Sequence, residues 1–347
     1  MVLIKWHKKT AIVKYKAGTI MYMKNSQTMI FVVGLLGLLG LVAVSSPARA
    51  QSWPQRTIKF IVPFGPGAGA DIGARLFAEK LSAKWGHPVV IENRPGGDSI
   101  VAINAFLTAN DDHTFLFGPA GSFTVHPFVY TKLAYDQKEI FPIARVSNTI
   151  LAMAVKQDAP YKTVKEFTEA VRKEPGKFNS GLVPGITEFT FWGYEHTEGL
   201  KVTQVPYRDI NVAPVDLGEG RIQVVMSSLA IVQPQWQAGR IRLLAVNNRT
   251  RAAAAPDVPT VREAGYPSLE VEGLVGLFGI RSLSNELKNK IAADFRAVTA
   301  DGSIAERLKA TGQVINVGGP KEFADAIEEQ RTKIAATVKA IDFKPKN

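Results

Sequence analysis

The feature that most restricts the fold of this chain is a regular alternation of short β-rich runs with helical stretches. The runs are four to seven residues long and rich in Val, Ile, Leu and Phe, and helical patterns lie between them. Such alternation is typical of α/β units that build mainly parallel sheets. We therefore expect strands at residues 58–64, 89–92, 114–118, 151–155, 202–207, 222–226, 242–246, 274–280 and 314–317.

Helix boundary signals support this division of the chain. Thr163 and Glu166 form a capping box that predicts the start of one helix. Pro320 predicts the start of a long helix, which we expect to end near Ala340. No Gly/Ser-rich tether separates the units, so any two domains are joined by structured segments.

The first 50 residues have the composition of an export signal. They hold seven basic residues and no acid, Met29 to Val44 is an apolar run of 16 residues, and Ala48–Ala50 is a small-x-small cleavage site. The run is shorter than the roughly 20 residues of a membrane-spanning helix, so an uncleaved anchor is the weaker alternative. We expect cleavage after Ala50 and a periplasmic protein, with translation starting at Met1 or Met23.

Without this segment the chain is almost neutral. The whole chain has 42 Lys and Arg against 31 Asp and Glu, and taking away the seven basic residues of the segment leaves 35 against 31, or +4. Such a balance is ordinary for a soluble protein. The composition therefore gives no reason to expect nucleic acid as a partner.

The residues of metal sites and of nucleophilic catalysis form no motif in this sequence. The chain has no cysteine, which excludes disulfides, thiolate metal sites and a cysteine nucleophile. It has neither a His-x-x-x-His pair nor a Gly-x-Ser-x-Gly motif. We expect no metal, no cofactor and no enzymatic activity. The histidines after residue 50 are His87, His113, His126 and His196.

One stretch, VPFGPGAGADIGARL from Val62 to Leu76, carries the strongest sign of a binding site. A strand, a glycine-rich turn and a helix N-terminus in this order often hold an anion. A triphosphate-binding loop is not expected, because Ala70-Asp71 stands where Lys-Ser/Thr is needed. A dinucleotide fingerprint fits loosely, with Glu92 in place of the ribose-binding acid. Pro66, which lacks an N–H, and the export signal both weaken that interpretation.

Two other interpretations of this loop remain, a cradle for a carboxylate and a tight turn without a ligand. Small residues let the backbone approach an anion, and the N–H groups of Ala68 to Ala70 together with the helix dipole favour negative charge. We expect Asp71 to cap the helix and to fix the loop. The loop by itself favours neither interpretation.

Further motifs accompany the loop in a characteristic order. Each motif alone is weak. Together they resemble the Bug family, the extracytoplasmic substrate-binding proteins of tripartite tricarboxylate transporters, over almost the whole chain after residue 50. The motifs are PFGPGAGAD with ARLFAEKL, PVVIENRPGG, DDHTFLFGPAGS, HPFVYTKLAYD, VPYRD, AGRIRLLAV, PDVPTVREAGYP and GGPKEFADAI.

The resemblance implies the fold of a two-lobe periplasmic binding protein, of the Venus-flytrap, type II-like kind. Two α/β lobes with mainly parallel sheets would enclose a cleft, and crossing strands would form the hinge. The first lobe would comprise residues 51–150 and 273–347. The second would comprise residues 151–272.

The resemblance also implies that two loops and nearby strand ends contact the ligand, largely through backbone amides. The first loop matches well, although Ala68 replaces a usual glycine. Ser122 has a second interpretation as a helix cap, and Arg208 has one as a solvated surface cation. The expected contacts are Phe64, Gly67, Ala68, Gly69, Ala70, Asp71, Ser122, Val183, Gly185, Thr187, Tyr207, Arg208 and Ser227.

The second loop, NSGLVPGITEF from Asn179 to Phe189, departs from the family pattern and is shorter than usual. Gly185 and Thr187 are its plausible counterparts of the family's binding residues. Glu188 replaces a common histidine. An acid beside a carboxylate would be repulsive, so we expect Glu188 to cap the helix or to face outward.

The helix after the second loop is rich in aromatic residues, and these have two interpretations. They form part of a hydrophobic core, which is the usual place for such residues. Alternatively they line the cleft and select an aromatic or long apolar acid. The residues are Phe189, Phe191, Trp192 and Tyr194.

The function that the resemblance implies is that of a monomeric receptor. It would close around a small carboxylate, which could be a di- or tricarboxylate, an acidic amino acid or an aromatic acid, and deliver it to a tripartite tricarboxylate-type permease. An alternative is a ligand sensor that presents its closed form to a signalling kinase. A remote alternative is a dinucleotide-binding enzyme. The sequence identifies neither the carboxylate nor the choice between transport and signalling.

Overall fold

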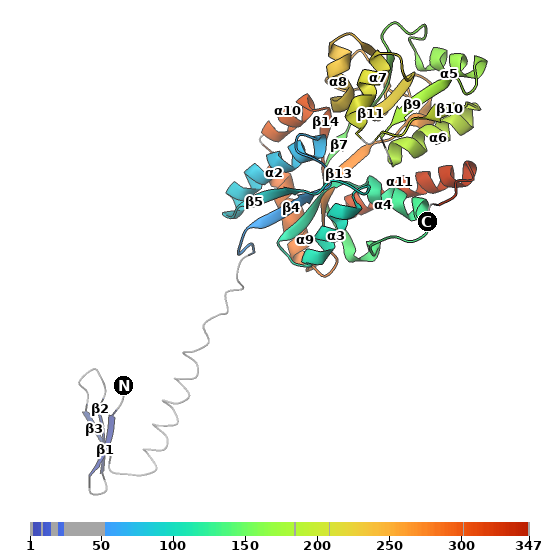
Figure 1. The fold of residues 1–347 in the computed structure, drawn as a ribbon. Coiled ribbons are helices and arrows are strands. Elements are labelled where there is room, and N and C mark those ends of the chain that lie inside the picture. The colour runs from blue at the N-terminus through green and yellow to red at the C-terminus, as the bar shows by residue number, and fades with distance from the viewer. Residues whose placement is uncertain are drawn as a thin grey trace. The chain divides into compact units, whose positions relative to one another are not determined.

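The computed structural model describes residues 53–345 except Pro184, Arg208 and Asp301, together with the backbone of three short strands near the N-terminus (Figure 1). The chain divides into two compact units, Met1–Gln55 and Arg56–Asn347.

The first unit contains a small antiparallel sheet. Its strands are β1 (Leu3–His7), β2 (Thr10–Lys14) and β3 (Ile20–Met23). The apolar run and the cleavage site predicted after Ala50 lie outside the described residues. The signal peptide therefore stays a prediction.

The second unit contains a six-stranded sheet built from two separate parts of the chain. Its strands are β4 (Ile58–Val62), β5 (Val89–Asn93), β6 (Thr114–Pro119), β7 (Ile140–Thr149), β13 (Gly273–Ile280) and β14 (Gln313–Gly318). Their order is β14-β7-β13-β6-β4-β5. Strand β4 runs parallel to β5 and β6, and the other pairings are antiparallel.

A five-stranded sheet takes its strands from the middle of the chain. They are β8 (Leu151–Lys156), β9 (Phe178–Leu182), β10 (Val202–Gln204), β11 (Val224–Ser228) and β12 (Ile241–Val246). Their order is β10-β9-β11-β8-β12. Strand β9 runs parallel to β10 and β11, and β8 runs antiparallel to β11 and β12.

Both sheets are therefore mixed, and the expectation of mainly parallel sheets is wrong. A parallel pair needs a crossover connection within one sheet. Strand β7 instead continues into β8 of the other sheet with only Ile150 between them. Its chain direction opposes that of its neighbours in the six-stranded sheet, and β8 opposes its own neighbours in the same way.

Helices cover the faces of both sheets, as Figure 1 shows. Those that pack with the six-stranded sheet are α2 (Gly69–Trp85), α3 (Ile100–Ala109), α4 (Gly121–Val129), α9 (Asn285–Ala297), α10 (Ser303–Ala310) and α11 (Pro320–Ala340). Those that follow strands of the five-stranded sheet are α5 (Val164–Lys173), α6 (Ile186–Glu198), α7 (Ala213–Gly218) and α8 (Leu229–Gln237). Within the described residues, no helix is both long and apolar enough to span a bilayer.

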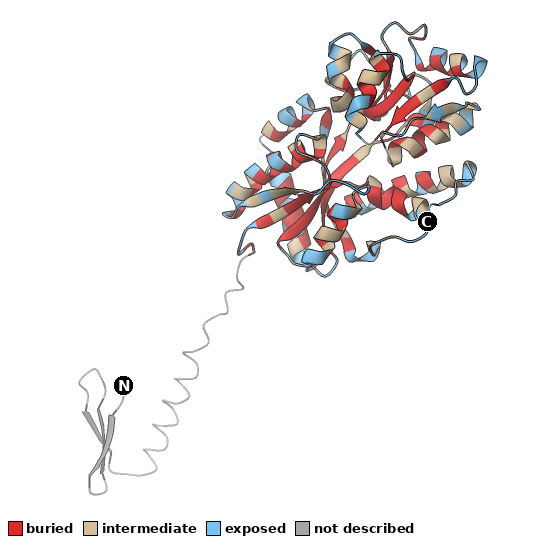
Figure 2. Ribbon diagram, in the orientation of Figure 1, coloured by how far each residue is buried: buried red, intermediate tan, exposed pale blue. Residues whose placement is uncertain are grey.

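Buried side chains follow the inner strands of both sheets, which Figure 2 shows in red, whereas the edge strands β5, β10 and β14 are mostly only partly buried. Under α2 and α9 the core is aromatic. The ring of Phe60 stacks on that of Phe117 at 5.8 Å and on that of Phe295 at 6.2 Å, and Phe77 lies 5.0 Å from Phe295. Burying each such ring stabilises the fold by about 1.5–3 kcal/mol.

The predicted helix boundaries hold where local chemistry sets them. Thr163 accepts the N–H of Glu166 at 3.1 Å as the N-cap of α5, and α11 spans Pro320–Ala340 as expected. The three strands of the first unit were not predicted, and in the second unit β7 and β9 were not. Strand β7 contains a proline, an arginine and an asparagine, and β9 reads FNSGL, so neither has a clear strand pattern.

Two segments cross between the sheets, β7–β8 and the return segment 247–272 that leads to β13, and they are hydrogen-bonded to each other. The side chain of Asn248 accepts the N–H of Leu151 at 2.9 Å and donates to the carbonyl of Thr149 at 3.3 Å. The N–H of Asn247 donates to the carbonyl of Leu151 at 2.9 Å. The predicted α/β architecture with crossing strands is thus confirmed.

Candidate functional site

Most of the predicted contacts lie where parallel strands end and helices begin. Strand β4 leads into α2 and β6 into α4, while β9 leads into α6 and β11 into α8. Because β4 is adjacent to β6, and β9 to β11, each sheet brings two helix N-termini together. Such N-termini carry unpaired N–H groups and partial positive charge, and both favour an anion.

The first loop is held by the carboxylate of Asp71, which is only 1% exposed. One oxygen accepts the N–H of Gly67 at 2.8 Å and Nε of Arg75 at 3.0 Å. The other accepts Nδ2 of Asn93 at 2.8 Å, and the same amide group donates to the carbonyl of Phe64 at 2.8 Å. The loop is therefore fixed from both of its ends.

Asp71 is not the N-cap that we expected. Ala68 occupies the cap position without a side-chain bond, and Asp71 is the third residue of α2. Burial alone would raise the pKa of Asp71. The hydrogen bonds from Arg75, Asn93 and the N–H of Gly67 outweigh burial and hold the pKa below its usual range. The carboxylate is thus an ion that organises the loop.

The same loop leaves room and donors for a ligand. None of the hydrogen bonds found among the described residues uses the N–H groups of Gly69, Ala70 or Asp71. A Cβ added at Gly65 or at Gly67 would meet no atom within 4 Å. Gly67 has a φ of 85°, which disfavours any other residue there, whereas Gly65 has no such restriction. The N–H of Gly67 is itself engaged by Asp71.

Three side chains that position this loop were not among the predicted contacts. Gln313, at the start of β14, donates to the carbonyl of Gly69 at 2.8 Å and accepts the hydroxyl of Ser147 at 3.0 Å. Arg75 and Asn93 bind Asp71. Asn93 ends the strand next to β4, so the predicted strand order could have identified it. Nothing in the sequence brings Gln313 to the loop.

The second loop uses a related device. Glu188, in the first turn of α6, accepts the N–H of Gly185 at 2.8 Å and the side-chain amide of Gln204. Of the two expected positions of Glu188, a helix cap or an outward-facing side chain, the structure shows the cap. Gly185 has φ 97° and ψ −124°, a conformation that only glycine adopts readily, and a Cβ there would meet open space.

The hydroxyl of Thr187 is already used within the second loop. It donates to the carbonyl of Val183, and Thr187 is 1% exposed. The N–H of Val183 in turn donates to the carbonyl of Met226 in β11. Thr187 can therefore donate to a carboxylate only if it releases Val183, and its ligand contact stays a prediction.

The two predicted serines lie at the ends of β6 and β11. Ser122, the second residue of α4, is 8% exposed and makes no hydrogen bond to another described residue through its hydroxyl. Ser227 is fully buried, and its hydroxyl has no partner among the described residues. Neither hydroxyl is engaged by another described residue, and the ligand contacts of both serines stay predictions.

The remaining predicted contacts lie on the segment after β10. The hydroxyl of Tyr207 donates to the carboxylate of Asp216 at 2.9 Å. Burial, together with this acid, raises the pKa of Tyr207 to about 12. Its proton is therefore committed to Asp216. Arg208 lies outside the described residues.

The aromatic residues of α6 pack in cores. Phe191 and Tyr194 lie in the core beneath the five-stranded sheet, and the hydroxyl of Tyr194 bonds Thr168 at 2.7 Å. Phe189 is fully buried, and Trp192 stacks on Phe343 at 5.7 Å. The packing favours the core interpretation, and the cleft-wall interpretation finds no support in it.

The structure also weakens the dinucleotide interpretation, because Glu92, the acid expected to bind the ribose, is held by other side chains. Lys59 holds the carboxylate of Glu92 at 2.7 Å and Arg94 holds it at 2.6 Å, while the next residue, Asn93, turns to the loop.

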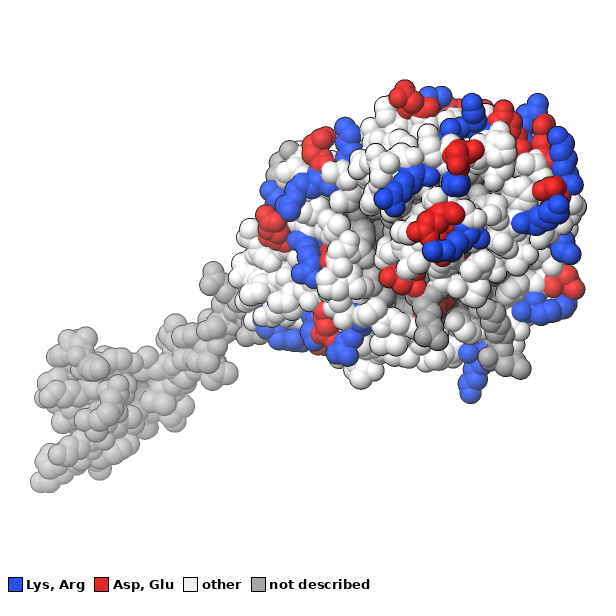
Figure 3. Space-filling view, turned by 45° about the horizontal axis from the view of Figure 1, so that its top comes forward, with Lys and Arg blue, Asp and Glu red and all other residues white. Residues whose placement is uncertain are grey.

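Within the described residues, no three His, Cys, Asp or Glu side chains are placed to bind a metal ion. Figure 3 shows basic and acidic side chains interspersed over the visible face, as the near-neutral composition predicts.

Comparison with known proteins identifies the family of this fold. The family model described as "Tripartite tricarboxylate transporter family receptor" matches residues 73–343. A UPF0065 protein of Bordetella bronchiseptica is 28% identical over 308 residues, which cover 88% of this chain and 92% of that protein.

Two solved structures share the fold over most of their length. A periplasmic transporter is 30% identical with a TM-score of 0.73, and the match covers 83% of this chain and 98% of that one. Rpa4515 of R. palustris, solved with adipate, is 26% identical with a TM-score of 0.75, and the match covers 85% and 100%. The family consists of solute-binding receptors and not of enzymes. The chain belongs to the tripartite tricarboxylate transporter receptor family, as its resemblance to Bug proteins predicted.

Proposed function

We propose that this protein is a periplasmic receptor that binds a small carboxylate between its two sheets and delivers it to a tripartite tricarboxylate-type permease. The observation that carries the proposal is the N-terminus of α2. Three N–H groups, those of Gly69, Ala70 and Asp71, have no partner among the described residues, and a buried carboxylate network fixes the loop that presents them. The adipate in the related structure of Rpa4515 supports a carboxylate as the ligand class.

Backbone amides suit this task because they recognise a carboxylate without carrying net charge. Free hydroxyls at Ser122 and Ser227 add one donor from each sheet. The exposed ring of Phe64, which is 37% accessible, can cover the apolar part of a ligand. This combination would bind several small acids and would select among them by length and shape.

Lobe closure is the proposed mechanism. The lobes would be residues 51–150 with 273–347, and residues 151–272, as the sheet memberships of the strands support. The hydrogen bonds of Asn248 to Thr149 and Leu151 mark the place where the connecting segments meet. A ligand that touches both lobes favours the closed form, because it makes additional interactions there, and the permease would recognise that form.

Export and a monomeric state belong to the same proposal. The signal peptide would be cleaved after Ala50, which places the mature chain, residues 51–347, in the periplasm. Delivery to a permease requires an accessible cleft, which a monomer provides.

A thermal-shift screen of residues 51–347 tests the ligand class. The panel would hold C4–C8 dicarboxylates, citrate, acidic amino acids, benzoate-type acids and NAD. A ligand at 100 times its dissociation constant should add about 2.7 kcal/mol to the free energy of unfolding. A shift with NAD alone would contradict the proposal.

Delivery is tested by uptake of the ligand that the screen identifies. Deleting the receptor gene should abolish uptake. Unchanged uptake together with lost gene induction by the same ligand would instead identify a sensor.

A further inference from the structure

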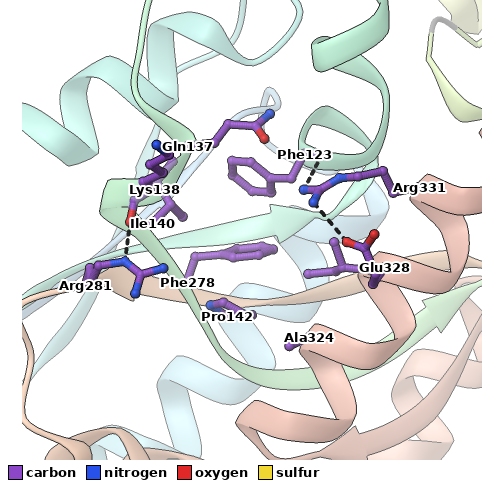
Figure 4. A pocket seen from close by; sticks show the side chains of 11 residues that line it. Phe123, Gln137, Lys138, Ile140, Pro142, Phe278, Arg281, Ala324, Glu328 and Arg331 are labelled. Carbon is purple, nitrogen blue, oxygen red and sulfur yellow. Dashed lines mark hydrogen bonds and ion pairs between the residues drawn. The ribbon is translucent and has the colours of Figure 1, made fainter. Parts of the chain in front are cut away.

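A pocket of about 320 Å³ lies among the first turn of α4, the start of β7, the end of β13 and α11 (Figure 4). Its wall includes none of the residues expected to contact the transported ligand. The volume is that of a small-molecule site at the lower end of the usual range.

The floor of the pocket is apolar and aromatic. Phe123 and Phe278 are 5% and 1% exposed, and their ring centroids lie 4.6 Å apart. Ile140 and Ile327 are each 7% exposed and add aliphatic surface. A ligand here would bury its apolar part against rings and branched side chains, which provides most of the affinity of small-molecule sites.

The rim of the pocket is positive. Lys138, Arg281 and Arg331 line it against one acid, Glu328, so three positive charges meet one negative charge. Figure 4 shows Arg281 and Arg331 on opposite sides of the two phenylalanine rings. Glu328 is bound by Nη1 of Arg331 at 2.9 Å and does not neutralise the other two cations.

One donor at this rim is unused and a second is at most weakly engaged. Nε of Arg331 is buried and has no hydrogen-bond partner among the described residues, and Nε2 of Gln137 makes no hydrogen bond of good geometry although it faces the hydroxyl of Tyr135. The terminal nitrogens of Arg331 donate to Glu328 and to the carbonyl of Phe123, the latter at 3.2 Å. Nε of Arg281 donates to the carbonyl of Lys138. Buried donors without an acceptor cost free energy, which an acceptor on a ligand would recover.

We propose that this pocket is a second binding site, for a small monocarboxylic acid with an apolar body of about the size of benzoate. The apolar body would lie on Phe123 and Phe278, and the carboxylate would accept from Gln137, Arg331 and the cationic rim. The site goes beyond the proposed transport function because its wall includes none of the residues expected to contact the transported ligand.

The test uses benzoate as the probe and the Gly65→Val protein, in which the cleft is blocked, beside the unmodified mature protein. NMR signals of the Gln137 side-chain amide and of Nε–H of Arg331 report on the pocket directly. We expect both signals to move saturably in both proteins. Acetate, which lacks the ring, and benzyl alcohol, which lacks the charge, should bind at least about tenfold more weakly.

Two variants locate the site. Lys138→Gln with Arg281→Gln removes the exposed cations and should weaken benzoate binding at least about tenfold, and Ala324→Phe should fill the pocket and abolish the signal shifts. The matched control is Lys132→Gln with Lys165→Gln, which removes the same charge from exposed positions outside the pocket wall. Pocket signals that stay fixed at about 20 mM benzoate, or a double variant that binds like the unmodified protein, would overturn the proposal. If the cleft binds no acid, the proposed transport function fails, but the NMR signals of the pocket residues should still move with benzoate.

Discussion

The loops before α2 and before α6 are fixed by the same kind of hydrogen bond, but the acids that accept it are buried to different degrees. In each, an acid in the first turn of the helix accepts the N–H of a preceding glycine with positive φ, Asp71 for Gly67 and Glu188 for Gly185. Asp71 is almost fully buried, whereas Glu188 is only partly buried.

The partners of the two acids differ in origin. Asp71 binds Asn93 of the neighbouring strand, and Gln313, far along the chain, holds the carbonyl of Gly69 in the same loop. Glu188 binds its own glycine and Gln204 of the neighbouring strand β10. The first loop is thus fixed by distant parts of the molecule and the second mainly by local ones. We expect the first to act as the rigid anchor and the second to tolerate change.

The largest effect should come from removing the buried acid. Asp71→Ala leaves the N–H of Gly67 and the amide of Asn93 without their acceptor and should lower the free energy of unfolding by about 2–4 kcal/mol. Urea unfolding measures this. The control Asp158→Ala removes an acid that is 72% exposed and should cost under about 0.5 kcal/mol. Equal losses in the two variants would show that the first loop is no more fixed than the surface.

Blocking the anchor should abolish binding without unfolding the protein. Gly65→Val places a side chain into the open space before α2 at a position without positive φ, and Gly65→Ala places a smaller one there. We expect the valine variant to bind the ligand at least about 100-fold more weakly, or about 2.7 kcal/mol, and the alanine variant to lie between. Calorimetric titration decides this. Affinity within about tenfold of the unmodified protein would place the ligand elsewhere.

The pH dependence of stability should show whether Asp71 is ionised in the folded protein. The folded state lowers the pKa of Asp71, so the unfolded state binds more protons as the pH falls. The stabilisation by Asp71 is complete above its ordinary pKa of about 4 and is lost as the pH falls through the lower folded value. Asp71→Asn should therefore differ from the unmodified protein most near pH 7, and the difference should shrink as the pH falls below about 4. A difference that persists undiminished into acid would contradict an ionised Asp71.

A smaller effect is expected at the second loop. Glu188→Gln retains an acceptor for Gly185 but turns an amide donor toward the donor of Gln204, so it should cost about 1 kcal/mol of stability. The double change Glu188→Gln with Gln204→Glu restores the donor–acceptor pairing and should recover most of that loss. Denaturant unfolding of the three proteins provides the comparison, and absence of recovery would disprove the pairing.

The smallest effect on binding is expected at Thr187. Its hydroxyl donates to Val183, so Thr187→Val should cost about 0.5–1.5 kcal/mol of stability and leave affinity within about twofold. A tenfold loss of affinity in a titration would show that the hydroxyl turns to the ligand in the closed form. In that case the second loop is as much an anchor as the first.

Much of this architecture could be predicted from the sequence because it depends on local chemistry. The α5 cap at Thr163 and the bounds of α11 needed only neighbouring residues. Glu188 as a cap followed from the repulsion that it would otherwise exert. Strand β7 could not be predicted, because its polar residues are accommodated by pairing with β13 and β14, which no local pattern reveals.

The sequence by itself determined that α/β units follow an export-like segment, that a glycine-rich turn opens a helix, and to which family the chain belongs. Only the tertiary structure decided that both sheets are mixed, that Asp71 holds the loop from the third position of its helix, and that Gln313 supports it. The physical reason is the distance along the chain between the residues that interact. Caps and turns are set by bonds between near neighbours, whereas strand direction and the partners of a buried carboxylate depend on segments that meet only when the chain folds.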